Sequence, residues 1–179
     1  VVNILPEGGR NSKVVLVYEI IDENGIEQMK EYQLNTYSLT LQKSEIVKAD
    51  GSIVPAEEGS GTLVFSNLAI GDVIYIEYES YSNSTGRFYK DFNLDCYFNS
   101  TYPTVEAVFA IINPENVNYS TKLFNGNITP IVKKINNKTC TIWKRTNVPA
   151  MPLLEPYSKN FTDLTNTINV SSIKSWKEI

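Results

Sequence analysis

Two acidic residues on one strand have the spacing that most suggests chemistry. Glu77 and Glu79 lie two positions apart in the alternating run Val73 to Tyr81, so their carboxyl groups would share one strand face, about 6–7 Å apart. Glycosidases use two carboxyl groups at comparable separations as acid and base or nucleophile. A solvated polar strand face is the interpretation we favour, because nothing in the sequence marks either carboxyl group as the acid.

The residues needed for nucleophilic or metal chemistry are scarce. The 179 residues contain no histidine, which excludes histidine-based triads, dyads and zinc-hydrolase sites within this chain. Cys96 and Cys140 are too few and too far apart for a metal site or a disulfide framework. We favour buried free thiols, with a single cross-sheet disulfide as the alternative. We expect no catalytic residue, no metal site and no cofactor in this chain.

Tyrosine is the abundant resource, with 11 residues. Exposed aromatic rings stack on the apolar faces of sugars while the hydroxyl groups stay hydrated. A possible ligand platform in the strands predicted at 73–81 and 87–98 consists of Tyr75, Tyr81, Tyr89 and Tyr97. Half-buried cross-strand packing is the other common role of tyrosine in sheets.

The charge distribution limits the possible partners. The net charge is −4, with seven Lys and Arg against fifteen Asp and Glu in residues 1–100, and nine against five in residues 101–179. The basic residues of the second half are dispersed, so we expect no nucleic-acid binding. No apolar run approaches the roughly 18 residues of a membrane-spanning helix. Because the chain starts without Met and ends abruptly, we interpret it as a fragment or a processed form.

The hydrophobic pattern predicts an all-β protein. About ten short strands, separated by turns at intervals of roughly 8–12 residues, favour an antiparallel β-sandwich over βαβ units. The strand predicted at Val73 to Tyr81 is the clearest. The residues expected in the core are Ile74, Ile76, Tyr78, Phe92 and Trp143.

Turn signals divide the strands. Asp22 to Gly25 is predicted to be the turn of a hairpin between strands at 14–21 and 26–37, and Pro55 to Gly59 an acidic loop. Asp50-Gly51 and Asn136-Asn137 are typical of two-residue hairpin turns. The glycines expected where φ is positive or the turn is tight are Gly25, Gly51, Gly71 and Gly126.

The domain organisation follows from these elements. Residues 1–13 are expected to be an N-terminal extension, residues 14–170 one β-sandwich domain, and residues 171–179 a junction. In that junction Ser175 and Glu178 have the spacing of a capping box, which predicts the start of a helix that leads into a missing downstream domain.

Several short motifs resemble one bacterial family when they are taken in order. The most specific is Ile70-Gly71-Asp72-Val73-Ile74-Tyr75-Ile76-Glu77-Tyr78. The others are Val14-Val15-Leu16, Asp50-Gly51, Phe88 and Phe92, Tyr102-Pro103-Thr104-Val105, Trp143, Glu155-Pro156, Ser171-Ser172 and Ser175-Trp176-Lys177-Glu178. Over residues 12–179 the chain resembles a domain of unknown function that precedes transglutaminase-like cores in exported multi-domain proteins.

This resemblance implies an immunoglobulin-like β-sandwich, export to the periplasm or cell surface, and a papain-fold Cys-His-Asp core as the downstream partner. Neither Cys96 nor Cys140 matches the nucleophile of that core, and no catalytic residue carries over to this chain. We therefore expect a non-catalytic accessory domain of a transglutaminase-like or protease-like protein, which positions the core or binds a substrate or surface partner. The alternative is a carbohydrate-binding or adhesion module that acts through its tyrosine-rich strands or an exposed edge strand.

Overall fold

The chain is built almost entirely of β-strands. The computed structural model describes residues 1–34, 38–83, 85–151 and 159–173, which divide into two compact units. Unit 1 contains Val1–Arg10 and the chain from Asn83 onward, and unit 2 contains Asn11–Ser82. The all-β prediction with large antiparallel sheets is confirmed.

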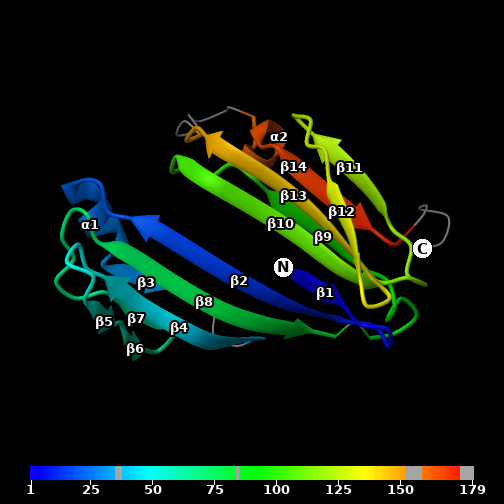
Figure 1. Cartoon of the computed structure of the whole chain (residues 1–179), viewed down its shortest axis with the longest axis horizontal. Helices are drawn as coiled ribbons and strands as arrows, with labels where there is room; N and C mark the ends of the chain where they lie inside the picture. The colour runs from blue at the N-terminus through cyan, green and yellow to red at the C-terminus, as the bar shows by residue number, and fades with distance from the viewer. Residues whose placement is uncertain (35–37, 84, 152–158, 174–179) are drawn as a thin grey trace. The chain divides into compact units, whose positions relative to one another are not determined.

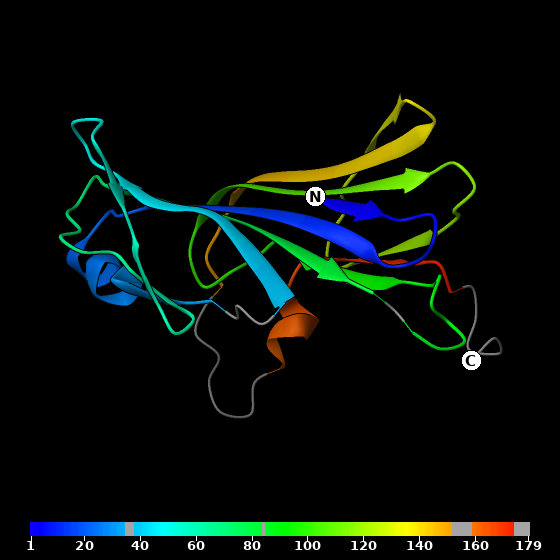
Figure 2. The same cartoon turned by 90° about the horizontal axis from the view of Figure 1, so that it is seen from below.

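Unit 1 consists of two sheets in separate layers (Figures 1 and 2). In one layer its strands have the order β12-β13-β10-β1, and the other layer is a three-stranded sheet with the order β11-β14-β9. The strands are β1 (Val2–Ile4), β9 (Asn93–Tyr97), β10 (Thr104–Pro114), β11 (Ser120–Phe124), β12 (Ile131–Ile135), β13 (Lys138–Val148) and β14 (Thr167–Ser171), and helix α2 spans Phe161–Leu164. β1 pairs with β10 in parallel, and the other pairs are antiparallel.

The core of unit 1 lies between these two sheets. Trp143 of β13 is 1% exposed, and its indole stacks on the ring of Phe109 with 5.6 Å between centroids. The buried residues of this core are Val2, Ile4, Phe92, Phe98, Phe109, Ile111, Trp143, Ile168 and Val170. Phe92 and Trp143 are therefore core residues, as the sequence predicts.

Unit 2 has the same general construction. One sheet has the strand order β2-β8-β4-β5 and the other the order β3-β7-β6. The strands are β2 (Arg10–Glu19), β3 (Glu31–Gln33), β4 (Leu39–Val47), β5 (Ile53–Pro55), β6 (Glu57–Gly59), β7 (Thr62–Val64) and β8 (Val73–Ser82), and helix α1 spans Glu23–Met29. The buried core contains Ile20, Met29, Leu34, Ile46, Leu63, Phe65, Ile74 and Ile76, with Tyr78 packed against it at partial exposure.

The predicted hairpin turn at residues 22–25 is wrong, because this segment begins helix α1. The Asp22 side chain caps the helix by accepting a hydrogen bond from the Gly25 N–H, at 2.7 Å between the heavy atoms. Ile26 and Met29, one helical turn apart, pack on the core of unit 2. Asp22 and Gly25 are residue types that favour turns, and a turn was predicted for this reason, whereas Asp22 acts as a helix cap. Within the described residues of the strand predicted at 26–37, only Glu31–Gln33 form a strand, which is β3 and pairs with β7.

Three further expectations change. Residues 1–13 do not form an extension, because Val2 and Ile4 are buried in the core of unit 1 and β2 begins at Arg10. Pro55 to Gly59 contributes to strands β5 and β6 rather than forming only a loop. The single domain expected over 14–170 corresponds to parts of both units. The helix predicted from Ser175 lies outside the described residues.

Two predicted hairpins are present. β4 and β5 pair around Gly51, which has φ of 84°, and β12 and β13 pair around Asn136 and Asn137, with φ of 46° and 59°. Gly71 also has positive φ. At Gly126 the reason for glycine is close packing against Asn166, because a Cβ atom there would lie 2.8 Å from the Asn166 amide nitrogen.

Truncation of Trp143 tests the core of unit 1. Trp143→Ala is expected to lower the free energy of unfolding by about 3–5 kcal/mol, because it leaves a large cavity beside Phe109. Denaturant unfolding followed by circular dichroism measures this loss. Ile131→Ala on the neighbouring strand removes an exposed side chain and serves as the control. Equal stability of the two variants would contradict the core assignment.

Candidate functional site

The four tyrosines proposed as a ligand platform are divided between the two units. Tyr75 and Tyr81 lie on β8 of unit 2, whereas Tyr89 and Tyr97 belong to unit 1. Tyr81, Tyr89 and Tyr97 are exposed, and Tyr75 is half-buried. Each ring must therefore be judged by its own surroundings.

Tyr75 belongs to an ion-pair network on the outward face of the β2-β8-β4 sheet. Its hydroxyl group donates a hydrogen bond to Glu77 Oε2 at 2.6 Å, and Lys13 Nζ lies 2.5 Å from Glu77 Oε1. On the other side Lys43 pairs with Glu45 at 2.7 Å and lies 5.3 Å from the centroid of the Tyr75 ring. Cross-strand pairing places Lys43 opposite Glu77 and Glu45 opposite Tyr75.

The contacts of Glu77 favour its ionised form and the protonated forms of its two donors, Lys13 and Tyr75. The hydrogen bond from Lys13, followed by that from Tyr75, lowers the pKa of Glu77 below its usual value. The same contacts to Glu77 raise the pKa of Lys13 and of Tyr75. Both oxygens of Glu77 are thus engaged by neighbours of its own sheet, while Glu79 is exposed. The arrangement favours a polar strand face over a pair of catalytic carboxyl groups.

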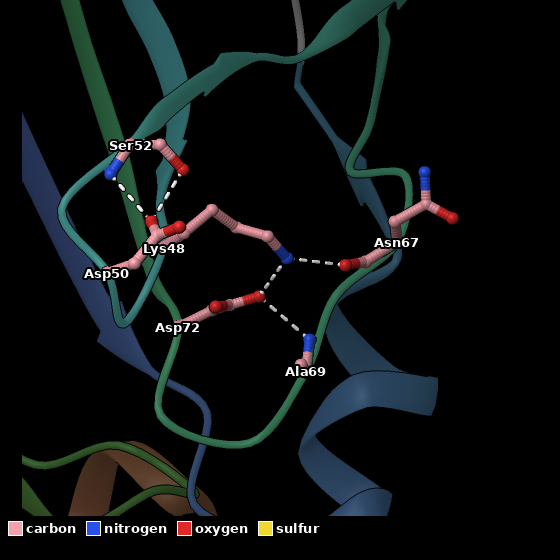
Figure 3. A network of polar contacts seen from close by, with 6 residues as sticks. All are labelled: Lys48, Asp50, Ser52, Asn67, Ala69 and Asp72. Atoms are coloured by element: carbon pink, nitrogen blue, oxygen red, sulfur yellow. Dashed lines mark hydrogen bonds and ion pairs between the residues drawn. The ribbon is translucent and has the colours of Figure 1, made fainter.

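The most buried carboxylate belongs to Asp72 in unit 2 (Figure 3). The Asp72 side chain is 2% exposed, and its Oδ2 accepts hydrogen bonds from Lys48 Nζ at 2.6 Å and from the Ala69 N–H at 2.8 Å. Lys48 Nζ also donates to the carbonyl oxygen of Asn67, at 2.6 Å. The ammonium group therefore ties the loop before β8 to the end of β4.

The environment of Asp72 suits a structural role. Burial by itself raises the pKa of this carboxyl group, but the hydrogen bonds from Lys48 and Ala69 outweigh burial and lower the pKa below its usual value. The backbone of Asp72 also belongs to this hydrogen-bond network, because its carbonyl oxygen accepts a hydrogen bond from the Ile20 N–H at 2.9 Å. The carboxylate stays ionised and binds Lys48 and Ala69. The backbone hydrogen bond holds the start of β8 beside the end of β2.

The two cysteines are free thiols. Cys96 packs against the core of unit 1 from β9, and burial raises the pKa of its thiol to about 11. Cys140 lies on β13 at a position of opposite parity to the core residue Trp143, and it is buried. The cross-sheet disulfide left open by the sequence is not formed, and Cys96 stays protonated at neutral pH.

Phe124, which the sequence did not indicate as a site residue, shares a sheet face with Tyr97. β14 lies between β9 and β11, with Tyr97 opposite Thr167 and Phe124 also opposite Thr167. Both rings are therefore on the outward face of the three-stranded sheet of unit 1. The signal in the sequence was weak, because β11 alternates Lys122, Leu123 and Phe124 and gives no indication of which strand lies beside it.

No group of three or more His, Cys, Asp or Glu side chains in the described residues is arranged to hold a metal ion. In the same part of the chain, neither helix has the length and apolar character required to cross a membrane.

Comparisons with known proteins agree with the β-rich architecture. The family described as "Domain of Unknown Function with solved-structure structure (DUF3857)" matches residues 60–152. A crystal structure of a "putative protease" from Parabacteroides distasonis has the same fold over 97% of this chain, with a TM-score of 0.79 and 14% sequence identity. This chain spans 39% of the length of that protein. None of the curated proteins matches the sequence.

Neutralising Asp72 tests the hydrogen-bond network around its carboxylate in unit 2. Asp72→Asn is expected to cost about 1.5–3 kcal/mol of stability at pH 7, because Lys48 and Ala69 lose a charged acceptor. The pKa of Asp72 is lower in the folded protein than the unfolded value of about 4. Its contribution is therefore present above pH 4 and is lost as the pH falls through the folded pKa. The stabilities of the two proteins should converge in acid.

Urea unfolding between pH 3 and pH 7 measures this difference. Glu115→Gln is the control, because Glu115 forms an exposed pair with Lys134 at 3.3 Å and such pairs contribute about 0–1 kcal/mol. A stability difference for Asp72→Asn that does not change with pH would show that the charge of Asp72 is not what stabilises the loop.

Proposed function

This chain belongs to the DUF3857 family, and we propose that it is a non-catalytic accessory domain of a longer, exported, protease-like protein. In this proposal a transglutaminase-like core follows the chain in the parent protein, and the chain positions that core. The absence of histidine supports the non-catalytic role, because a papain-like core needs a Cys–His pair that this chain cannot supply.

One comparison carries the proposal. The fold of this chain recurs over 97% of its length in a "putative protease", where it accounts for 39% of the protein. A domain with this fold is therefore joined to a larger partner in at least one protein. Export to the periplasm or cell surface is part of the same proposal and is supported by the motifs shared with exported multi-domain proteins.

The outward face of the β12-β13-β10 sheet is a suitable surface for the core. Trp143, Phe109 and Ile111 occupy the inward positions, so the outward positions are those of opposite parity on each strand. One group of cross-strand neighbours among them is apolar and consists of Ala110, Ile112, Ile131, Cys140 and Ile142. Charged side chains lie on the same face beside this group, such as the ion pair of Lys144 with Glu106. Strands with apolar residues on both faces are typical of sheets covered on both sides.

Two exposed residues on this face are the best positions for variants. Val108 is 50% exposed and Ile131 is 53% exposed. Large exposed apolar patches on soluble proteins mark interaction surfaces. The core is the occupant that the proposal assigns to this face.

The first test is the gene that encodes the parent protein. The sequence downstream of Ile179 is expected to encode a core with Cys, His and Asp in the order of transglutaminase-like enzymes. A gene that ends close to Ile179 would overturn the accessory role.

The second test uses the full-length parent protein. Val108→Glu with Ile131→Glu is expected to weaken docking of the core, because two carboxylates would lose their hydration in an apolar interface. Thermal unfolding and peptidase or transamidase activity of the parent protein should both fall, while the unfolding of the separate chain stays unchanged. Val17→Glu, on an exposed position of β2, is the matched control. Equal behaviour of the double variant and this control would contradict docking on this face.

A further inference from the structure

The outward face of the β9-β14-β11 sheet carries an ordered array of side chains, three from each strand. Antiparallel pairing aligns them in rows across the sheet. The rows are Tyr97, Thr167 and Phe124, then Asp95, Asn169 and Lys122, and finally Asn93, Ser171 and Ser120. Inward positions on β9 and β14 are apolar, with Ile168 and Val170 fully buried, so the face is set apart from the core by strand parity.

The first row places two exposed aromatic rings at opposite edges of this face. Tyr97 is 45% exposed and Phe124 is 40% exposed, while Thr167 between them is buried. Because their strands are separated by β14, the backbones of the two residues lie about 10 Å apart. This spacing is comparable to the length of a disaccharide. Lys122 Nζ lies 4.8 Å from the centroid of the Phe124 ring.

Asn169, at the centre of the second row, holds two side chains of β9 through hydrogen bonds. The Asn169 amide nitrogen donates hydrogen bonds to Asp95 Oδ1 at 2.8 Å and to Asn93 Oδ1 at 3.0 Å. These bonds fix three side chains on two strands before any ligand arrives, which lowers the entropic cost of binding. A carboxylate accepts about four hydrogen bonds, so Asp95 retains capacity for ligand donors.

The balance of charge on this face indicates the class of ligand. Among its nine positions, three on each strand, only Asp95 and Lys122 are charged, and their charges are opposite. A nucleic acid would require net positive charge. A protein interface would have an apolar centre, whereas here the centre is Asn169 with Ser171 beside it. A ligand with hydroxyl groups that both donate and accept, and with apolar faces for two rings, fits these side chains.

We propose that this face binds a neutral oligosaccharide, with Tyr97 and Phe124 stacking on sugar rings and Asp95, Asn169 and Lys122 binding the hydroxyl groups. The site is separate from the surface assigned to the core, and it does not rest on the accessory role. Tyr97 is the only one of the four tyrosines suggested by the sequence that is placed in this array.

Affinity electrophoresis of the intact chain tests the proposal. Four gels each contain one neutral polysaccharide: xylan, mannan, mixed-linkage β-glucan or dextran. A fifth gel contains polygalacturonate, an acidic polysaccharide, for comparison. At least one neutral polysaccharide is expected to retard the chain. Tyr97→Ala and Phe124→Ala should each weaken that binding about tenfold or more, as truncation of central aromatic contacts does. Asp95→Ala should weaken it as well.

The matched control is Tyr81→Ala, which removes an exposed tyrosine from β8 in the other unit and should leave retardation unchanged. Circular dichroism of each variant verifies that it is folded. Asp95→Asn provides a milder change, which removes the charge of the side chain and keeps its size. Absence of retardation by all four neutral polysaccharides would overturn the proposal. Equal losses for the Tyr97 and Tyr81 variants, or retardation by polygalacturonate alone, would overturn it too.

Discussion

Strand parity across paired registers is the constraint on which this molecule depends. On each strand the odd or even place of a residue decides whether it enters the core or faces outward, and a shift of one residue in pairing would exchange the two faces. In unit 1 the pairing of Phe109 with Trp143 places both rings inside, and the whole β10–β13 register follows from it. An outward Trp143 would lose both its burial and its stacking on Phe109.

Parity also explains why one chain carries three different outward faces. The outward face of β2-β8-β4 carries ion pairs that neutralise one another, such as Lys13 with Glu77. The outward face of β12-β13-β10 carries a group of apolar side chains beside the ion pair of Lys144 with Glu106, while the outward face of β9-β14-β11 is polar with two aromatic edges. The first of these needs no partner in water, because its charges are paired and hydrated. The second and third have residues whose burial by a partner would be favourable.

The same reasoning separates groups that stabilise the fold from groups that are available for chemistry. Asp72 is buried, but its charge is committed to Lys48 and to the Ala69 N–H. Glu77 is likewise bound on both oxygens. The high pKa of the Cys96 thiol reflects burial among apolar residues rather than activation. The contacts of these three groups therefore suit structural roles.

The sequence by itself determined the β-rich class, the hairpins at Gly51 and at Asn136-Asn137, and core residues such as Ile74, Ile76 and Trp143. These follow from local rules, since alternation and turn chemistry act within a few residues. Asp22 was misassigned because the same residue type caps helices and initiates turns. Only the tertiary structure decided that Val2 and Ile4 enter the core of unit 1, that the four tyrosines are divided between two units, and that Phe124 shares a face with Tyr97. Those outcomes depend on pairing between strands far apart in the chain, about which local patterns carry no information.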